Sequence, residues 1–168
     1  MSVKHPIISV TGSSGAGTTS VKRTFERIFR REGINAAFIE GDAFHRYDRL
    51  EMKQVMGEEA KKGNHHFSHF GLKANLLSEL EAVFQQFGET GTGKTRHYVH
   101  DEDEEQLYGS PPGTFTAWQP IAGDTELLFY EGLHGAVVTD EVNLARYCDL
   151  KIGVVPVVNL EWIQKIHR

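Results

Sequence analysis

A segment rich in glycine and small hydroxyl residues lies near the start of the chain, directly after a short apolar run. The apolar run is Ile7, Ile8 and Val10. The segment after it consists of Gly12, Ser13, Ser14, Gly15, Ala16, Gly17, Thr18, Thr19 and Ser20. Because glycine has no Cβ, backbone N–H groups in such a segment can close on an anion such as phosphate. We therefore predict that a buried strand leads into a phosphate-binding turn.

A helix is predicted to follow this turn. Val21, Phe25, Ile28 and Phe29 recur with the spacing of one helix face, and Gly33 is suited to end the helix. The positive N-terminus of such a helix faces the same phosphates as the turn. The turn and the helix together predict a triphosphate site.

The turn departs at one position from the usual phosphate-loop pattern, G-x-x-x-x-G-K-[ST]. Gly12 and Gly17 are spaced correctly, but Thr18 stands at the lysine position. Residues 88–95, GETGTGKT, match the whole pattern. A helix-period segment precedes them and an extended segment follows, whereas a phosphate loop needs a strand before it and a helix after it. We interpret 88–95 as a helix-to-strand loop with Gly88 as the helix C-cap, and keep it as the alternative triphosphate site.

Two acidic residues follow apolar strand candidates. Residues 36–39 lead into Asp42, and residues 126–130 lead into Glu131. Phosphoryl transfer needs a group that orients or deprotonates the attacking hydroxyl, and it needs oxygen ligands for Mg²⁺ beside the triphosphate. Asp42 fits the first need and Glu131 fits the second. The alternative for each is to cap a helix or close a turn.

Basic residues follow the first of these acids at helical spacing. His45, Arg49 and Lys53 are four residues apart, so on a helix they would share one face. A cationic face next to a candidate base suits an anionic acceptor such as a sugar phosphate better than a neutral nucleoside. A solvated helix face is the alternative.

A further basic set lies on the third strand candidate or just after it. Alternation along a strand places Arg96 and Tyr98 on one face and His97 on the other. His100 follows directly after these residues.

Five apolar strand candidates recur along the chain, and several of the gaps between them hold helix-period segments. They are residues 7–10, 36–39, 95–99, 126–130 and 150–155. This alternation predicts an α/β fold, a P-loop NTPase-like, mostly parallel sheet flanked by helices, in one domain over residues 1–168. Ligands then lie beyond the carboxyl ends of the strands. Residues 101–125 are irregular and rich in glycine and proline, and we predict a functional loop there.

The composition is that of an ordinary globular protein, with 39% hydrophobic and 24% charged residues. No apolar run approaches the ~20 residues of a membrane span and no signal-cleavage site is present, which predicts a cytoplasmic protein without membrane contact. A net charge of −5 gives no electrostatic case for binding nucleic acid. Cys148 is the only cysteine, so we predict a core thiol and no intrachain disulfide.

Two clusters carry weak signals for metal binding. His65 and His69 are four residues apart with His66 between them, but no glutamate, cysteine or nearby third ligand completes a zinc motif. We therefore predict that residues 65–70 form a loop lining the substrate cleft. The acidic run 101–105 is interpreted as a solvated loop, with a metal or partner role as the alternative.

The last ten residues, NLEWIQKIHR, have the pattern of an amphipathic helix. Trp162 and Ile166 share one face, and Lys165 and Arg168 fall on the other. Because Thr18 cannot neutralise a phosphate, a mobile cationic helix is a suitable source of the missing charge. An exposed polar face is the alternative.

Several segments, taken in order, resemble the phosphoribulokinase branch of the phosphoribulokinase and uridine kinase family. They are GSSGAGTTS, EGDAFHR, RHYVHD, FYEGLHGAV and DLKIGVVPVVNLEWIQKIHR, and the resemblance spans essentially the whole chain. It implies ATP-dependent phosphorylation of D-ribulose 5-phosphate at its 1-hydroxyl, which yields ribulose 1,5-bisphosphate for carbon fixation in the Calvin cycle.

The same resemblance implies a role for each matching position. Asp42 would be the catalytic base, and Thr19 and Glu131 would lie near Mg²⁺. Lys165 and Arg168 would be lid cations on the transferring phosphoryl group. The positions implied around the sugar phosphate are His45, Arg49, Lys53, Tyr98 and His100.

The resemblance also bears on assembly and length. Bacterial members are typically oligomers activated by NADH and inhibited by AMP, and they continue well beyond Arg168. The chain is therefore expected to be the N-terminal part of a longer family sequence, truncated at its C-terminus. The alternatives are a uridine or other small-metabolite kinase of the same family, and a non-catalytic nucleotide-binding fragment.

Overall fold

The computed structural model describes residues 4–156, together with residues 163 and 166. In chain order the elements are β1 (Ile7–Gly12), α1 (Thr18–Glu32), β2 (Ala36–Glu40), the 3-10 helix η1 (Gly41–Phe44), α2 (Arg49–Lys61), η2 (Leu72–Ala74), α3 (Leu77–Thr90), β3 (Lys94–Thr95), α4 (Glu102–Tyr108), β4 (Gln119–Pro120), β5 (Leu127–Gly132), η3 (Leu144–Tyr147) and β6 (Leu150–Val154).

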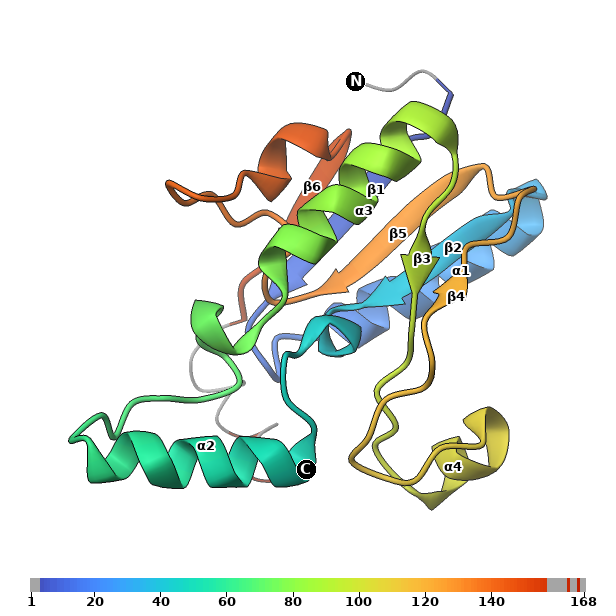
Figure 1. Ribbon diagram of the computed structural model, residues 1–168. Helices are drawn as coiled ribbons and strands as arrows, with labels where there is room; N and C mark the ends of the chain where they lie inside the picture. Colours follow the sequence, from blue (N-terminus) through green and yellow to red (C-terminus); the bar gives the residue numbers. More distant parts are fainter. Residues whose placement is uncertain (1–3, 157–162, 164–165, 167–168) are drawn as a thin grey trace.

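Four parallel strands form the central sheet, in the order β2-β5-β1-β6 (Figure 1). The register pairs Val10 of β1 with Glu131 of β5, and Glu131 with Glu40 of β2. Because all four strands run in the same direction, their carboxyl ends meet at one edge of the sheet. The predicted α/β fold with a parallel sheet is confirmed.

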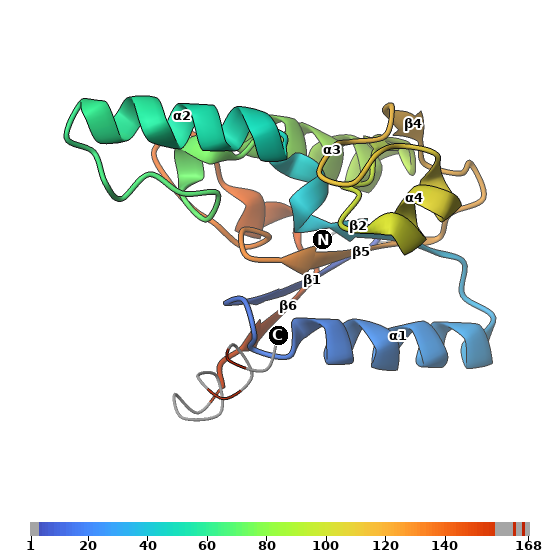
Figure 2. The same cartoon turned by 90° about the horizontal axis from the view of Figure 1, so that it is seen from below.

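Helices cover both faces of this sheet, as the edge-on view in Figure 2 shows. Side chains alternate along each strand, so Phe129 faces α1 and Tyr130 faces α3. On the α1 side, Phe129 packs against Phe25 and Phe29 with ring centroids 5.1 and 6.0 Å away. On the α3 side, Tyr130 packs edge-on against Phe84. The two apolar layers fix α1 and α3 on opposite sides of the strands.

A glycine flanks helix α1 at each end. Gly17 precedes its first residue with φ at 98°, and Gly33 caps its C-terminus with φ at 71°. Both angles lie in a region that glycine adopts without a steric cost. The predicted strand, turn and helix are therefore confirmed, and so is the helix end at Gly33.

The third strand candidate, residues 95–99, is not part of the parallel sheet. Only Lys94–Thr95 form a strand, β3, which pairs antiparallel with β4 away from the central sheet. Beyond it, His97 and Val99 exchange backbone hydrogen bonds with Thr116 and Thr114. The prediction was wrong because residues 94–120 form a separate antiparallel hairpin, here called the arm. Residues 94–99 bond to residues 114–120 of the same arm and not to the central sheet.

The prediction that Gly88 ends the helix before residue 94 was also wrong. Helix α3 continues to Thr90, and Gly91 is the C-cap, with φ at 71°. Gly88 lies within the helix, where an added Cβ would be 3.9 Å from Ile7. The order helix, loop and strand predicted for residues 88–95 is confirmed, because β3 begins at Lys94.

The acidic run after residue 100 forms a helix and not the solvated loop that we predicted. Asp101 caps α4 by accepting a hydrogen bond from the amide of Glu104, 3.0 Å away. Four acidic residues occupy the first turn, where they face the positive end of the helix dipole. The charge run therefore stabilises a short helix at the tip of the arm.

The single cysteine is buried against the sheet, as predicted. The thiol of Cys148 donates to the carbonyl oxygens of Gly135 and Leu144. Burial raises its pKa to about 11, which keeps it protonated and unreactive. Among the described residues, no helix combines the length and apolar character that a membrane crossing requires.

Candidate active site

The strand ends bring the glycine segment and the acidic residues to the same edge of the sheet. Glu40 and Glu131 end neighbouring strands, and each is followed by a glycine. A Cβ on Gly132 would lie 2.8 Å from the Cα of Gly41, so the two backbones touch at this point. This close approach places the turn that carries Asp42 directly beside the end of β5.

The nine predicted phosphate-site residues are contiguous and run from the last residue of β1 through the loop into the first turn of α1. No side chain caps the N-terminus of α1. Its first amides therefore lack the usual side-chain acceptor and are available to an anion. Thr18, at the lysine position, donates its hydroxyl to Glu131, and Thr19 is exposed.

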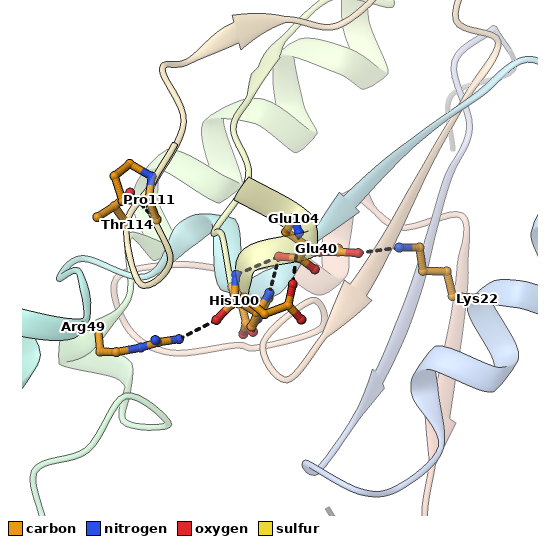
Figure 3. Close-up of polar contacts among 9 residues, drawn as sticks. Lys22, Glu40, Arg49, His100, Glu104, Pro111 and Thr114 are labelled. Carbon is orange, nitrogen blue, oxygen red and sulfur yellow. Dashed lines mark hydrogen bonds and ion pairs between the residues drawn. The ribbon is translucent and has the colours of Figure 1, made fainter. Parts of the chain in front are cut away.

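Lys22 is a cation beside this loop that the sequence patterns did not reveal. It lies one turn into α1 and contacts Glu40 at the end of β2, with its Nζ 2.5 Å from the Glu40 Oε1 (Figure 3). Burial alone would lower the pKa of Lys22, but the hydrogen bond to Glu40 and the nearby acids raise it overall. Lys22 lies on α1, and Glu40 points from β2 toward the same side of the sheet. Strand alternation could therefore have predicted from the sequence that Glu40 faces this helix.

Glu131 is a partly buried carboxylate in this cluster. Burial is the main reason why its pKa is raised, and the nearby charge of Glu40 acts in the same direction. The hydrogen bond from Thr18 and the charge of Lys22 oppose this rise. A carboxylate that is costly to ionise without a counter-charge is a suitable oxygen ligand for a divalent cation.

Asp42 is surrounded by imidazole rings. Its Oδ2 lies 3.0 Å from the Nε2 of His100, and its Oδ1 lies 3.4 Å from the Nε2 of His45. Burial would raise the pKa of Asp42, but the hydrogen bond to His100 and the charges of His45 and His69 lower it overall. The carboxylate is therefore ionised at neutral pH and open to a proton from a bound hydroxyl.

His100 joins Asp42 to the arm. Its Nδ1 lies 2.9 Å from the Oε2 of Glu104, on the opposite side of the ring from Asp42. The hydrogen bond with Asp42 is the main reason why the pKa of His100 is raised to about 9. The ring is therefore an imidazolium at neutral pH. Glu104 was missed in the acidic run, although its place three residues after the cap Asp101 has the spacing of a capping box.

The predicted basic face on one helix was wrong. His45 precedes the helix, because Asp48 caps α2 and Arg49 is its first residue. Arg49 turns toward the arm, where its Nη2 donates to the carbonyl oxygen of His100 at 2.9 Å. Lys53 lies one turn further along α2 and is exposed. Arg49 and Lys53 therefore share α2, and His45 belongs to the turn before it.

Tyr98 and Arg96 connect the arm to the turn that bears Asp42. The ring of Tyr98 lies 6.0 Å from that of His45 and 5.0 Å from that of His100. Arg96 donates to the carbonyl oxygens of Ala43 and His45, each at 2.8 Å. Its guanidinium also covers the rings of Phe115 and Trp118. The sequence predicted Arg96 only as part of a basic set. In the structure it joins the arm to the turn of Asp42 by hydrogen bonds to the carbonyl oxygens of Ala43 and His45.

The three histidines of residues 65–69 are all exposed on the predicted loop, and His69 is the one with a contact to the site. The ring of His69 lies 5.8 Å from that of His45. His134 is buried, and its Nε2 lies 3.1 Å from the carbonyl oxygen of Phe70. In the part of the chain that the structure describes, no group of three His, Cys, Asp or Glu residues could hold a metal ion. Lys165 and Arg168 lie outside the described residues.

Comparisons with known proteins agree on one family. The sequence model of the "Phosphoribulokinase / Uridine kinase family" matches residues 7–168. A phosphoribulokinase of Nitrobacter vulgaris is 72% identical over 98% of this chain, and the chromosomal phosphoribulokinase of Cupriavidus necator is 63% identical over all of it. The chain spans 57% and 58% of the length of these two relatives.

Solved structures show the same relationship. Phosphoribulokinase from Rhodobacter spheroides is 59% identical, with a TM-score of 0.86 over 98% of this chain and 56% of that one. A possible uridine kinase from Bacillus stearothermophilus is 12% identical, with a TM-score of 0.62 over 99% of this chain and 82% of that one. The second likeness concerns the fold alone.

Proposed function

The chain belongs to the phosphoribulokinase and uridine kinase family, and on that premise we propose that it catalyses ATP-dependent phosphorylation of D-ribulose 5-phosphate. The product is ribulose 1,5-bisphosphate. The observation that carries the proposal is the placement of Asp42, an ionised carboxylate at the same edge of the sheet as the glycine loop and in contact with the imidazolium of His100 on the arm. A base and a phosphate loop at one sheet edge, with a cation beside the base, suit a kinase whose acceptor is itself anionic.

The residues of the glycine loop fit a nucleotide triphosphate. In the proposed complex, backbone amides of residues 12–20 hold the phosphates of ATP at the uncapped N-terminus of α1. Thr19 and Glu131 are the ligands proposed for Mg²⁺, which needs only one or two protein oxygens when phosphates supply the rest. Bound Mg²⁺ would neutralise charge on the transferring phosphoryl group.

Asp42 is the proposed catalytic base. Its lowered pKa keeps it ionised, so that it accepts a hydrogen bond from the 1-hydroxyl and then the proton as that oxygen attacks. The ion pair with His100 makes Asp42 a weaker base, and the acceptor sugar must enter between or beside these two groups.

The acceptor phosphate is proposed to lie among polar side chains between α2 and the arm, four of them from basic residue types and one a tyrosine. These residues are His45, Arg49, Lys53, Tyr98 and His100. Phosphate in this position would compete for the guanidinium of Arg49, which here donates to a backbone carbonyl. Lys165 and Arg168 are proposed to contribute positive charge to the transferring group, in place of the lysine that Thr18 replaces.

The wider setting follows from the same proposal. A ribulose-phosphate kinase would act in the cytoplasm and supply the bisphosphate for carbon fixation by the Calvin cycle. The complete protein is proposed to form a homo-oligomer that responds to NADH and AMP. We propose no role in binding nucleic acid.

A coupled assay of ADP release tests the function. The protein, extended to the length of its relatives, is incubated with ATP and Mg²⁺ and with ribulose 5-phosphate, uridine or no acceptor. We expect ADP release only with ribulose 5-phosphate. Efficient turnover of uridine would favour the nucleoside kinase, and ATP binding without turnover of any acceptor would favour a nucleotide-binding protein.

A further inference from the structure

Glu104 makes two hydrogen bonds to a single residue, His100. Its Oε2 accepts the backbone N–H of His100 at 2.7 Å and lies 2.9 Å from the ring Nδ1. Figure 3 shows Glu104 against His100 in this arrangement, with Arg49 contacting the carbonyl oxygen of His100. One carboxylate oxygen therefore fixes both the backbone and the ring of His100.

This contact determines which way the other ring nitrogen points. With Nδ1 bound to Glu104, the Nε2 of His100 lies 3.0 Å from the Oδ2 of Asp42. Each of these carboxylates can only accept a hydrogen bond when it is ionised, so both ring nitrogens must donate. A ring that donates from both nitrogens is an imidazolium, in agreement with a pKa of about 9.

The groups around His100 come from three parts of the fold. Asp42 faces it from η1, Glu104 from α4, and Tyr98 from the arm, with ring centroids 5.0 Å apart. The Nε2 of His45 lies 3.4 Å from the other oxygen of Asp42, but burial lowers the pKa of His45, so this ring is largely neutral at neutral pH. Arg49 of α2 contacts only the carbonyl oxygen of His100. The two carboxylates therefore outweigh the cationic neighbours at the ring.

The start of α4 selects Glu104 for this contact. Asp101 caps the helix through the amide of Glu104, which places Glu104 in the third position of the first turn. A side chain there can reach back past the cap to residue 100. Its neighbours Asp103 and Glu105 are exposed, whereas Glu104 is half-buried.

We infer that Glu104 is a positioning residue of the acceptor site, which holds the His100 imidazolium in front of Asp42 so that an anionic sugar meets a fixed cation there. This inference rests on the proposed function in so far as the acceptor is a sugar phosphate. Glu104 itself does not touch the acceptor. Without it, the ring of His100 is free to rotate and loses its charge at a lower pH.

The test measures the titration of His100 by NMR in the 168-residue chain and in Glu104→Gln, which keeps the size and removes the charge. Glu105→Gln is the matched control, because it removes the same charge from the next residue of α4. His100→Asn serves to assign the ring signals. We expect the pKa of His100 to fall by about 1 or more in Glu104→Gln and to stay unchanged in Glu105→Gln. Glu104→Asp, which keeps the charge, should restore part of the loss.

The same variants are titrated with ribulose 5-phosphate by calorimetry at pH 6 and pH 9. If the pKa falls by about 1, the ring at pH 9 is about half charged in the wild type and about one-tenth charged in Glu104→Gln, so we expect about fivefold weaker binding. At pH 6 the ring is charged in both, and the difference should fall below about twofold. The charge of the sugar phosphate also changes with pH, but equally for all variants.

The outcomes separate the inference from the proposed function. An unchanged His100 titration in Glu104→Gln, or an equal effect of Glu105→Gln, would overturn the positioning role. Sugar binding weakened equally at both pH values would also overturn it, because a structural defect does not depend on the charge of one ring. Failure of the wild type to bind ribulose 5-phosphate, with the Glu104-dependent titration intact, would instead refute the proposed acceptor and support the positioning of His100.

Discussion

Two segments of this chain look alike as sequence and differ in structure. Residues 12–19, GSSGAGTT, connect β1 to α1 and lack the lysine of the phosphate-loop pattern. Residues 88–95, GETGTGKT, contain the full pattern but begin inside α3 and end on β3. Gly91 ends α3, and the ammonium of Lys94 lies 5.4 Å from the ring of Trp118.

The difference shows why context decides between two matches. A helix presents free N–H groups and a positive dipole end at its start, and free carbonyl groups and a negative end at its finish. Residues 12–19 meet the start of α1, whereas residues 88–91 form the finish of α3. The N-terminus of α1 attracts phosphate and the C-terminus of α3 repels it, even though only the second segment matches the full sequence pattern.

The substitution with the largest expected effect removes the proposed base, Asp42, and so tests whether phosphoryl transfer takes place at the sheet edge where residues 12–19 lie. Asp42→Asn in the protein extended to the length of its relatives should lower kcat by about 10²- to 10⁴-fold, because the amide cannot accept a proton. ATP and sugar binding should persist, since the shape is kept. Steady-state kinetics checks both, and a variant within about threefold of wild-type kcat would remove Asp42 from the mechanism.

The second prediction compares the two segments directly. Gly17→Val places a β-branched residue at φ 98°, a strain of about 1–3 kcal/mol that should distort the loop and weaken ATP binding by roughly 5- to 150-fold. An added Cβ there meets no atom within 4 Å, so the effect comes from the backbone angle and not from a clash. Lys94→Ala should leave ATP affinity within about twofold. Calorimetry on both variants decides between the segments, and loss of affinity in Lys94→Ala alone would reverse the assignment.

A third prediction concerns the arm that begins where the second segment ends. The guanidinium of Arg96 donates to two carbonyl oxygens at once, and the single ammonium of Lys in Arg96→Lys cannot reproduce this geometry. The substitution should lower the free energy of unfolding by about 1–3 kcal/mol. Arg27→Lys, on the exposed side of α1, is the control and should change stability by less than about 0.5 kcal/mol. Urea unfolding measures both variants. Equal stability of the two would show that Arg96 does not clamp the turn of Asp42.

The smallest expected effect is a dependence of stability on pH. The pKa of His100 is raised from 6.5 to about 9, so its contribution is fully present below pH 6.5 and is lost as the pH rises through 9. Because the ring is 41% exposed, solvent screening limits the loss to at most about 1 kcal/mol. Urea unfolding at pH 6.5 and 9 should show this decline in the wild type and not in His100→Asn. A decline of the same size in His100→Asn would assign it to other groups.

Features that depend on neighbouring residues in the sequence were predictable. The sequence predicted β1 from its apolar run, the loop from its glycines, and α1 up to Gly33 from the helix period. It also predicted Asp42 and Glu131 at one sheet edge, because both follow strand candidates. Each of these follows from local periodicity or from the φ angle of a glycine. The arm was missed for the same reason, because residues 95–99 alternate like a strand but pair with a return segment outside the sheet.

Features that depend on distant partners were not predictable. The contact of Arg96 with Ala43 spans 53 residues, and that of His100 with Asp42 spans 58. The spacing of Asp101 and Glu104 indicates a helix cap, but it does not reveal that the Glu104 carboxylate binds the ring of His100. The roles of the site residues, and those of Lys165 and Arg168, remain predictions.

The most direct test of where the nucleotide binds is a titration of the ¹⁵N-labelled 168-residue chain with Mg²⁺ and a non-hydrolysable ATP analogue, followed through the backbone amide signals. Because the amides of the bound loop donate to phosphate oxygens, we expect the signals of residues 13–20 to move by far the most. Signals of residues 88–95 should stay in place. Large shifts at residues 88–95, with those of residues 13–20 unchanged, would contradict the account.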